Sequence, residues 1–235
     1  RLKPGCRVVD DTMEMVSPCD GKVLHWGPVD AVSGVVEQVK GVSYSLKHFL
    51  GKEPELKKKV DDNADTRLYQ CVLYLAPGDY HCFHSPTDWT LDTRRHFPGE
   101  LLSVNPGIVR RIPSLFCLNE RVVYSGTWKH GFFSMTAVGA TNVGSVRVEL
   151  DPERVTNTRK WEADTFYQRV WDTGTEVKKG EYFGEFNLGS TIVIIFEAPE
   201  DFEFNFTSDG DTVRVGRSVM NVKEDICPAE EAKSN

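Results

Sequence analysis

The pattern of apolar and polar residues along this chain favours short β-strands over helices. Apolar, largely β-branched positions gather in brief runs that Gly, Pro, Asn and Asp interrupt, as is typical of strands bounded by turns. Strands are predicted at 68–75, 89–93, 101–104, 122–125, 131–138, 145–150, 192–196, 202–206 and 212–215. This spacing predicts a mainly β fold (α+β with few short helices) whose sheets form a sandwich or a barrel-sandwich hybrid.

The run 192–196, among the most apolar in the chain, follows directly on the small-residue turn Gly189-Ser190-Thr191. A run of β-branched and aromatic residues without a polar one predicts a strand that is buried on both faces. We therefore expect the Ser190 hydroxyl at the start of a rigid, buried strand. Its neighbour Gly189 has no Cβ, which leaves the Gly189 carbonyl open to close approach by other atoms.

Helical periodicity is scarce in the rest of the chain. A short amphipathic helix is predicted at 43–50, with Gly51 as its C-cap. The stretch 52–66 is polar and aperiodic and is predicted to be an exposed loop, and 151–173 is predicted to be polar and irregular. A hairpin-like turn at 176–181 leads to the Gly189 turn, and 221–235 is predicted to be a frayed acidic tail.

Composition narrows the class of protein. The 235 residues suffice for one large domain or two small ones, and the net charge of −7 argues against a nucleic-acid binder. No apolar run approaches the roughly 20 residues of a membrane-spanning helix. The sequence begins at Arg1 without Met, which leaves room for a targeting or membrane segment upstream. Six cysteines without a CxxC pair favour a reducing compartment over a disulfide framework.

Asp20, the pair His81 and His84, and Ser190 are candidates for a nucleophilic site. A Ser hydroxyl becomes nucleophilic when a base takes its proton, and a carboxylate commonly orients that base. All of these residues are predicted at strand edges or turns, where functional groups gather. Spacing alone leaves the ordinary alternatives open: a turn-capping aspartate, hydrogen-bonded loop histidines and a plain turn hydroxyl.

The segment from His81 to His84 also contains side chains that bind zinc well. Two histidines three residues apart on a strand point to opposite faces, however. No HExxH motif and no second Cys/His cluster accompany them. The sequence therefore predicts no metal site.

Several motifs, all in the same order along the chain, resemble those of the phosphatidylserine decarboxylase proenzymes. Leu188-Gly189-Ser190-Thr191 is similar to the self-cleavage motif of that family, in the form typical of mitochondrial and many bacterial members. The segment 80–86 resembles the paired-histidine motif, and 17–21 resembles the motif that carries the aspartate. Further similarity lies in 75–79, 96–99, 104–106, 120–122 and 138–145, so that the resemblance covers roughly 1–220.

The resemblance implies a single catalytic domain, 1–235, that cuts its own backbone. Asp20 would orient His84, and His84 would act as the base on Ser190 Oγ, which would attack the Gly189 carbonyl. The products would be a chain 1–189 and a chain 190–235 that begins with a pyruvoyl group made from Ser190. This covalent pyruvoyl group is the implied cofactor. Because a chain as short as 190–235 cannot build a sizeable core alone, it must stay woven into the sheet.

For the mature protein the resemblance implies decarboxylation of phosphatidylserine to phosphatidylethanolamine, with His81 as the acid that protonates the carbanion. The implied partners are phosphatidylserine, a membrane surface and the protein's own two chains, and a homodimer stays open. The implied location is the mitochondrial inner membrane, with a bacterial membrane as the alternative. Phe49, Trp89 and Phe97 are candidate membrane anchors, although a core position is predicted for each.

Two functions of other classes remain as alternatives. The first is a non-enzymatic carrier or binding module of the barrel-sandwich type, in which Gly189-Ser190 is an ordinary turn and the chain stays whole. The second is a metallopeptidase that holds zinc on His81 and His84. The state of the bond between Gly189 and Ser190 separates the decarboxylase from both.

Overall fold

The structure is a computed structural model that describes residues 3, 5–30, 33–56, 66–141, 145–158, 161–163, 165–187 and 189–221. Leu188 of the self-cleavage motif, most of the predicted loop 52–66 and nearly all of the predicted acidic tail lie outside these residues. Within the described part of the chain, no helix is long and apolar enough to cross a membrane.

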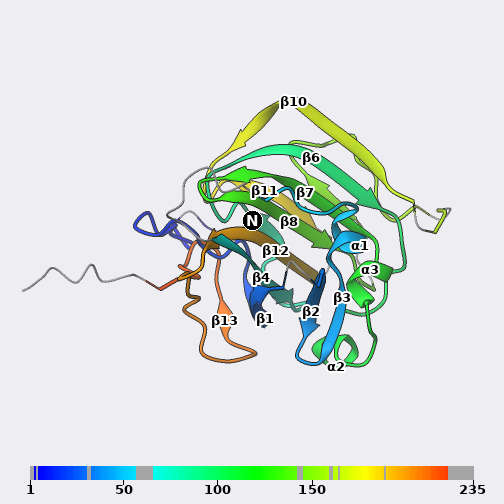
Figure 1. The fold of residues 1–235 in the computed structure, drawn as a ribbon, viewed down its shortest axis with the longest axis horizontal. Helices are drawn as coiled ribbons and strands as arrows, with labels where there is room; N and C mark the ends of the chain where they lie inside the picture. Colours follow the sequence, from blue (N-terminus) through cyan, green and yellow to red (C-terminus); the bar gives the residue numbers. More distant parts are fainter. Residues whose placement is uncertain are drawn as a thin grey trace, which may run out of the picture.

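A single eight-stranded antiparallel sheet dominates the molecule (Figure 1). In spatial order its strands are β10 (Tyr167–Val177), β6 (Trp89–Phe97), β7 (Arg121–Trp128), β8 (Gly131–Val138), β12 (Ser190–Pro199), β4 (Thr66–Leu75), β1 (Gly21–Val29) and β13 (Thr212–Val213). The predominance of strands confirms the predicted mainly β fold.

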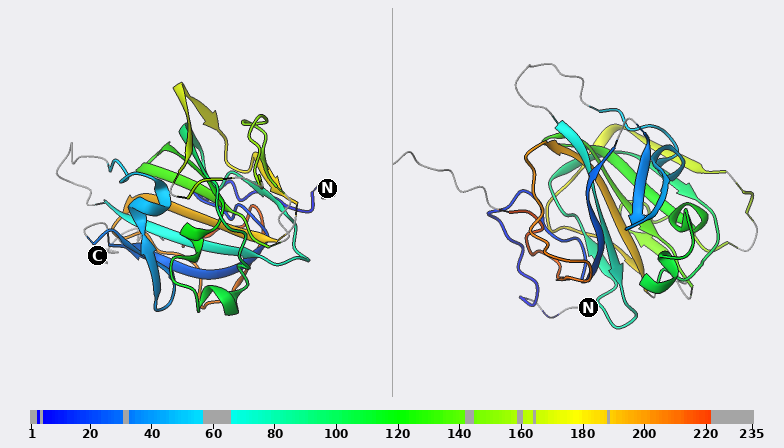
Figure 2. Two further views of the ribbon diagram at one scale, coloured as in Figure 1. Left: turned by 90° about the vertical axis from the view of Figure 1, so that its right-hand side faces the viewer. Right: turned by 60° about the horizontal axis from the view of Figure 1, so that its bottom comes forward.

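Two smaller sheets and three short helices accompany the large sheet in the described residues. The first small sheet has the order β5 (Cys82–His84), β11 (Tyr182–Phe186) and β9 (Val146–Val148), and the second pairs β2 (Val35–Val39) with β3 (Val42–Ser45). The helices are α1 (Leu46–Leu50), α2 (Pro106–Val109) and α3 (Leu115–Leu118). The helices and the β2–β3 hairpin gather beside the strands on one side of the molecule (Figures 1 and 2).

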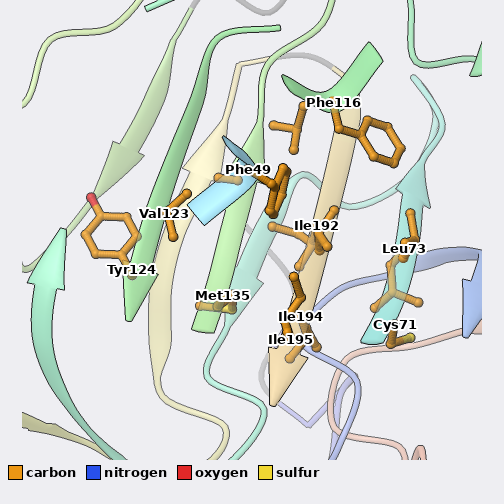
Figure 3. Close-up of a cluster of buried hydrophobic side chains, with 14 of the residues drawn as sticks. Phe49, Cys71, Leu73, Phe116, Val123, Tyr124, Met135, Ile192, Ile194 and Ile195 are labelled. Carbon is orange, nitrogen blue, oxygen red and sulfur yellow. The ribbon is translucent and has the colours of Figure 1, made fainter. Parts of the chain in front are cut away.

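Strand β12 lies in the middle of the large sheet because both of its faces are apolar. It pairs with β4 along its whole length, from Ser190 opposite Leu75 to Pro199 opposite Thr66, and with β8 on its other side. Every residue of β12 up to Ala198 is buried. Figure 3 shows its isoleucines packed among side chains of the neighbouring strands. The predicted buried strand at 192–196 is thus confirmed.

Side chains cover the large sheet on both faces, which makes it the middle layer of the fold. On one face the Phe183 ring of β11 packs against Tyr124 and Trp89, with ring centroids 5.2 and 6.0 Å apart. On the other face the Arg121 guanidinium lies over the ring of Phe49 from α1, 5.5 Å from its centroid. Phe49, Trp89 and Phe97 are all buried, which confirms the core position predicted for them.

The antiparallel register brings several chain segments to one end of the sheet. Ser190 lies opposite Leu75, and Lys22 of β1 lies opposite Tyr74, the residue before Leu75. Asp20, which directly precedes β1, therefore lies beside the end of β4, and β4 is the one strand between β1 and the strand of Ser190. On the other side of β12, Thr191 lies opposite Val138.

Several predicted elements differ from the structure. Residues 101–104 form no strand, because the Asn119 side chain takes the place of a neighbouring strand and bonds both the N–H and the carbonyl of Leu102. Residues 202–206 form only one bridge, Phe204 with Met220, and use their aromatic rings for packing. The segment 151–173 was expected to be irregular throughout, but its last part forms the start of β10.

The predicted helix 43–50 is shorter than expected because Ser45 starts it. The Ser45 hydroxyl accepts a hydrogen bond from the N–H of His48 and so caps the first turn, while 42–45 forms β3. The predicted C-cap is confirmed: Gly51 has φ +82°, and its N–H donates to the Lys47 carbonyl. The described cysteines, which exclude only Cys227, are all free, as expected for a protein without a disulfide framework.

Candidate active site

Ser190 is the first residue of β12 and is fully buried. Its Oγ has no hydrogen-bond partner, although its backbone is held in register with Leu75. A Cβ added to the preceding Gly189 would lie 3.2 Å from the Leu75 carbonyl oxygen, so the backbone is closely packed on that side. A rigid strand therefore presents an unsatisfied hydroxyl directly after a residue with no side chain.

The loop that follows β4 carries His81 to the same end of the sheet. The His81 carbonyl accepts a hydrogen bond from the N–H of Phe186, which precedes Ser190 by four residues. The ring Nδ1 of His81 lies 2.5 Å from the Asp79 carbonyl, which can only accept, so Nδ1 carries the hydrogen. The other nitrogen, Nε2, is buried and has no partner. Two unsatisfied polar atoms, Ser190 Oγ and His81 Nε2, thus belong to neighbouring segments.

His84 is held at both ring nitrogens. Its Nδ1 lies 3.0 Å from the Gly180 carbonyl oxygen and its Nε2 lies 3.2 Å from the Tyr80 hydroxyl. Because a carbonyl oxygen only accepts, Nδ1 carries the hydrogen, and in the neutral ring Nε2 accepts from Tyr80. Burial lowers the pKa of His84, while the Gly180 carbonyl and the charge of Asp20 oppose that shift. His84 is therefore held as a neutral base.

Asp20 lies in a tight turn before β1 and accepts hydrogen bonds from its own set of donors. Arg7 donates from Nε to Oδ1 at 2.9 Å and from Nη2 to Oδ2, and the Val215 N–H donates to Oδ1 at 2.9 Å. Burial alone would raise the pKa of Asp20, but the hydrogen bonds from Arg7 and Val215 outweigh it and lower the pKa. Asp20 is therefore held as a carboxylate.

The structure brings the sequence-predicted residues to one end of the sheet. Their direct contacts, however, differ from those of a simple Ser-His-Asp triad. The His84 N–H donates to the Pro18 carbonyl at 2.8 Å, which ties β5 to the turn that carries Asp20. Among the described side chains, however, those hydrogen-bonded to Asp20 and His84 are Arg7 and Tyr80, respectively. Asp20 acts on His84 through its charge. The orienting role predicted for Asp20 stays a prediction.

Four residues of the candidate site were not expected from the sequence: Arg7, Tyr80, Gly180 and Tyr182. Tyr80 and Arg7 bond the predicted residues directly, Gly180 contributes only its carbonyl, and the Tyr182 ring meets that of His84 edge-on with centroids 5.8 Å apart. Tyr80 was visible in the sequence as the neighbour of His81. A backbone carbonyl carries no signal in its residue type, so Gly180 could not have been found.

No group of three or more His, Cys, Asp or Glu side chains is arranged to hold a metal ion within the described residues. The three residues of the segment 81–84 that could bind zinc all have other partners, and only Nε2 of His81 is left without one. His84 is engaged at both ring nitrogens, and the Cys82 thiol lies 4.0 Å from a Glu185 carboxylate oxygen.

The fold and the site together define a mainly β protein with a buried serine at the start of its central strand and two histidines and an aspartate close by. The sequence profile of the phosphatidylserine decarboxylase family matches residues 1–221. The chain belongs to this family.

Individual relatives agree with that assignment. The chain is 50% identical over 238 residues to the mitochondrial phosphatidylserine decarboxylase proenzyme of Cricetulus griseus, covering 93% of this chain and 58% of the relative. It is 51% identical to that of Rattus norvegicus, covering 87% and 54%, and 37% identical to proenzyme 1 of Saccharomyces cerevisiae, covering 93% and 60%. The chain thus spans somewhat more than half the length of these relatives.

Proposed function

We propose that this chain is a self-processing decarboxylase of phosphatidylserine. The observation that carries the proposal is the Ser190 hydroxyl, which is buried beside Gly189 and has no hydrogen-bond partner. Leaving a buried hydroxyl unsatisfied costs about 1–3 kcal/mol, so stability alone does not favour a serine there. Membership of the decarboxylase family and the relatives' name as proenzymes support a reactive role for this hydroxyl.

The first proposed stage is cleavage of the bond between Gly189 and Ser190. Ser190 Oγ attacks the Gly189 carbonyl carbon, and His84 takes the hydroxyl proton and passes it to the amide nitrogen, which leaves as an amine. An ester now joins Gly189 to Oγ. Loss of the Ser190 Cα proton breaks the bond between Oγ and Cβ, which frees chain 1–189 with a terminal carboxylate. The dehydroalanine left at position 190 takes up water, releases ammonia and becomes a pyruvoyl group.

The residues around position 190 fit such a group. Gly189 is small, the β12 backbone is fixed by its pairing with β4, and His81 offers a buried nitrogen without a partner. A pyruvoyl group supplies a carbonyl that withdraws electrons from an attached amino acid, as pyridoxal phosphate does elsewhere. In the proposed second stage, His81 Nε2 holds and delivers the proton that replaces carbon dioxide, while the Asp79 carbonyl fixes the ring.

The proposed substrate is phosphatidylserine and the product phosphatidylethanolamine. Because the substrate is a lipid, the site must open towards a membrane surface. The relatives are named as mitochondrial proteins, and we place this chain at the mitochondrial inner membrane, bound peripherally or through a segment outside the sequence. The chain 1–235 acts as one catalytic domain, with 1–189 and 190–235 as its two products.

Mass spectrometry of the purified chain tests the proposal. We expect two chains that meet between residues 189 and 190, with the smaller one blocked at its amino terminus and reactive towards hydrazides, which capture ketones. Ser190→Ala should leave the chain whole. Ser208→Ala, which removes an exposed hydroxyl, is the matched control and should be cut like the wild type.

The two histidines separate the stages. His84→Ala should abolish or strongly slow cleavage, whereas His81→Ala should still be cut but lose most of its decarboxylation. If the wild type and His84→Ala both stay intact and free of ketone after long incubation, the proposal fails. If His81→Ala blocks cleavage and His84→Ala does not, the roles of the two histidines are reversed.

A further inference from the structure

A cavity of about 540 Å³ lies beside the candidate active site. It is lined by β9, a strand of the three-stranded sheet, and by the residues that follow β9. Tyr182, whose ring meets that of His84, forms part of its lining. Ser145 forms another part, and its Oγ accepts a hydrogen bond of 2.7 Å from Asn187 Nδ2. Asn187 precedes Gly189 by two residues. Two residues of the lining are therefore in contact with His84 and with the segment proposed to be cut.

Arg154 lines this cavity and is half-buried without a carboxylate of its own. Its Nε is buried and has no partner, its Nη2 donates only to the neighbouring Val155 carbonyl, and its guanidinium lies 5.7 Å from the centre of the Tyr167 ring. Burial and the charge of Arg94 lower the pKa of Arg154, while the charges of Glu120 and Asp151 oppose that shift. A guanidinium in this setting is stabilised when an anion reaches it.

The nearby carboxylates are already engaged. Asp151 accepts from Arg94 Nε at 2.8 Å and from Arg169 Nη1 at 2.9 Å. Glu120 accepts from the Asn157 N–H and lies 2.7 Å from His96 Nε2. Neither forms an ion pair with Arg154 in the part of the chain that the structure describes. Both carboxylates act on Arg154 through their charge, but neither bonds its guanidinium, so Nε is left open to an anion from outside these residues.

Two further charged side chains line the cavity and bear on what it accepts. Arg147 lies on β9 and Glu149 lies in the turn that directly follows it, and both are exposed. Arg147 is placed directly opposite Glu185 in the pairing of β9 with β11. These two carboxylates offset Arg147, which leaves Arg154 as the cation best placed for an incoming anion.

We propose that Arg154 forms a phosphate-ester subsite, which holds the headgroup phosphate of the lipid while its serine reaches position 190. The inference rests on the proposed function. The planar guanidinium donates two parallel hydrogen bonds to a phosphate, which suits it to this group. The substrate carboxylate is a poorer candidate, because a cation that stabilised it would favour the ground state over the loss of carbon dioxide.

A contact to a group that the reaction does not change is equally strong before and during the chemical step. It therefore alters KM and leaves kcat nearly unchanged. Arg154→Gln should be cut normally and should raise KM for a short-chain phosphatidylserine about tenfold or more, the effect of losing a charge-assisted hydrogen bond. Arg154→Lys should restore part of that loss. Arg67→Gln, with Arg67 opposite Ala198 at the far end of β12, is the control of equal charge change and should leave KM unchanged.

Soluble anions test whether Arg154 binds the phosphate or the carboxylate of the substrate. Glycerophosphoethanolamine carries the phosphate without the carboxylate, and free serine carries the carboxylate without the phosphate. We expect glycerophosphoethanolamine to compete with the substrate in the wild type and to lose that effect in Arg154→Gln, whereas inhibition by serine stays the same. If serine inhibition is lost instead, Arg154 binds the carboxylate and the proposal is wrong.

A binding measurement needs no catalysis and so separates this inference from the proposed function. In uncut Ser190→Ala protein, millimolar glycerophosphoethanolamine should raise Tm, and the added Arg154→Gln change should abolish the rise. Inorganic phosphate is the second probe. If only inorganic phosphate raises Tm and KM for the lipid does not respond to Arg154→Gln, the site takes free phosphate and the lipid assignment is overturned. Equal effects of Arg67→Gln and Arg154→Gln would also overturn it.

Discussion

At the scale of single residues, the hydrogen bonds of His84 decide which of its nitrogens can act as a base. The Gly180 carbonyl fixes the hydrogen on Nδ1, a task that a carboxylate performs in many Ser-His-Asp sites. The Nε2 lone pair is left to accept from the Tyr80 hydroxyl. Asp20, held by Arg7, contributes a negative charge nearby rather than a direct bond.

The lowered pKa of His84 has a measurable consequence for the proposed self-cleavage. A base must be neutral to take a proton, and the ordinary pKa of histidine is about 6.5. Because burial lowers the pKa of His84, the ring stays neutral to a more acidic pH than a free histidine. The rate at which the precursor disappears, followed by gel electrophoresis against pH, should fall with a midpoint below 6.5. A midpoint at or above 6.5 would contradict a buried, neutral base.

Removal of the Tyr80 hydroxyl should shift that midpoint upwards. A donor on Nε2 stabilises the neutral ring, so Tyr80→Phe should raise the pKa of His84. A net hydrogen bond contributes about 0.5–1.5 kcal/mol and one pKa unit equals about 1.4 kcal/mol, so the shift should be up to about one unit. Tyr182→Phe is the control, because the Tyr182 hydroxyl bonds Glu185 rather than His84. Equal shifts in both variants would speak against a specific role for Tyr80.

The sequence indicates residues for the candidate site, but it could not predict their contacts. Ser190, His81, His84 and Asp20 stand in recognisable motifs and converge on one end of the sheet. Their partners could not be predicted: Gly180 is 96 residues from His84 along the chain, and Arg7, 13 residues before Asp20, meets it through a loop that no sequence motif marks. A preference of residue type for a turn or a strand says nothing about such long-range contacts.

At the scale of elements, the hydrophobic pattern predicted the buried strand β12 well but missed the start of β10, which lies at one edge of the sheet. β12 is apolar on both faces and was predicted directly from its sequence. β10 is the edge strand of the large sheet, and most of its side chains are exposed or only partly buried, so its sequence lacks a hydrophobic face. The strand forms because its backbone pairs with β6, which no pattern of side chains reports.

The central position of β12 predicts a large effect of shortening its side chains. Ile194 is 1% exposed, and Ile194→Ala should lower the free energy of unfolding by about 2–5 kcal/mol, the usual effect of removing buried methyl groups. Val170→Ala, at a position 53% exposed on β10, should change it by less than about 0.5 kcal/mol. Urea denaturation of the uncut Ser190→Ala protein measures both without interference from cleavage. Similar losses in the two variants would contradict the central role of β12.

At the scale of the whole molecule, the proposed cut would divide a sheet without dividing its core. β12 and β13 lie after the cut, and their neighbours β4, β8 and β1 lie before it. After cleavage the two chains should elute together from a size-exclusion column in native buffer and separate in strong denaturant. Elution of the smaller chain alone in native buffer would contradict the pairing of β12 with both neighbours.

The register of Ser190 with Leu75 also makes the proposed self-cleavage depend on folding. Ser190 reaches its place beside the paired-histidine loop only once β12 has been inserted between β4 and β8. A chain that cuts itself through Ser190 therefore reports its own assembly, because every molecule that has been cut must first have formed the complete sheet. In freshly made protein, the fraction of chains that have been cut would then measure how many molecules have inserted β12, the last long strand, into the sheet.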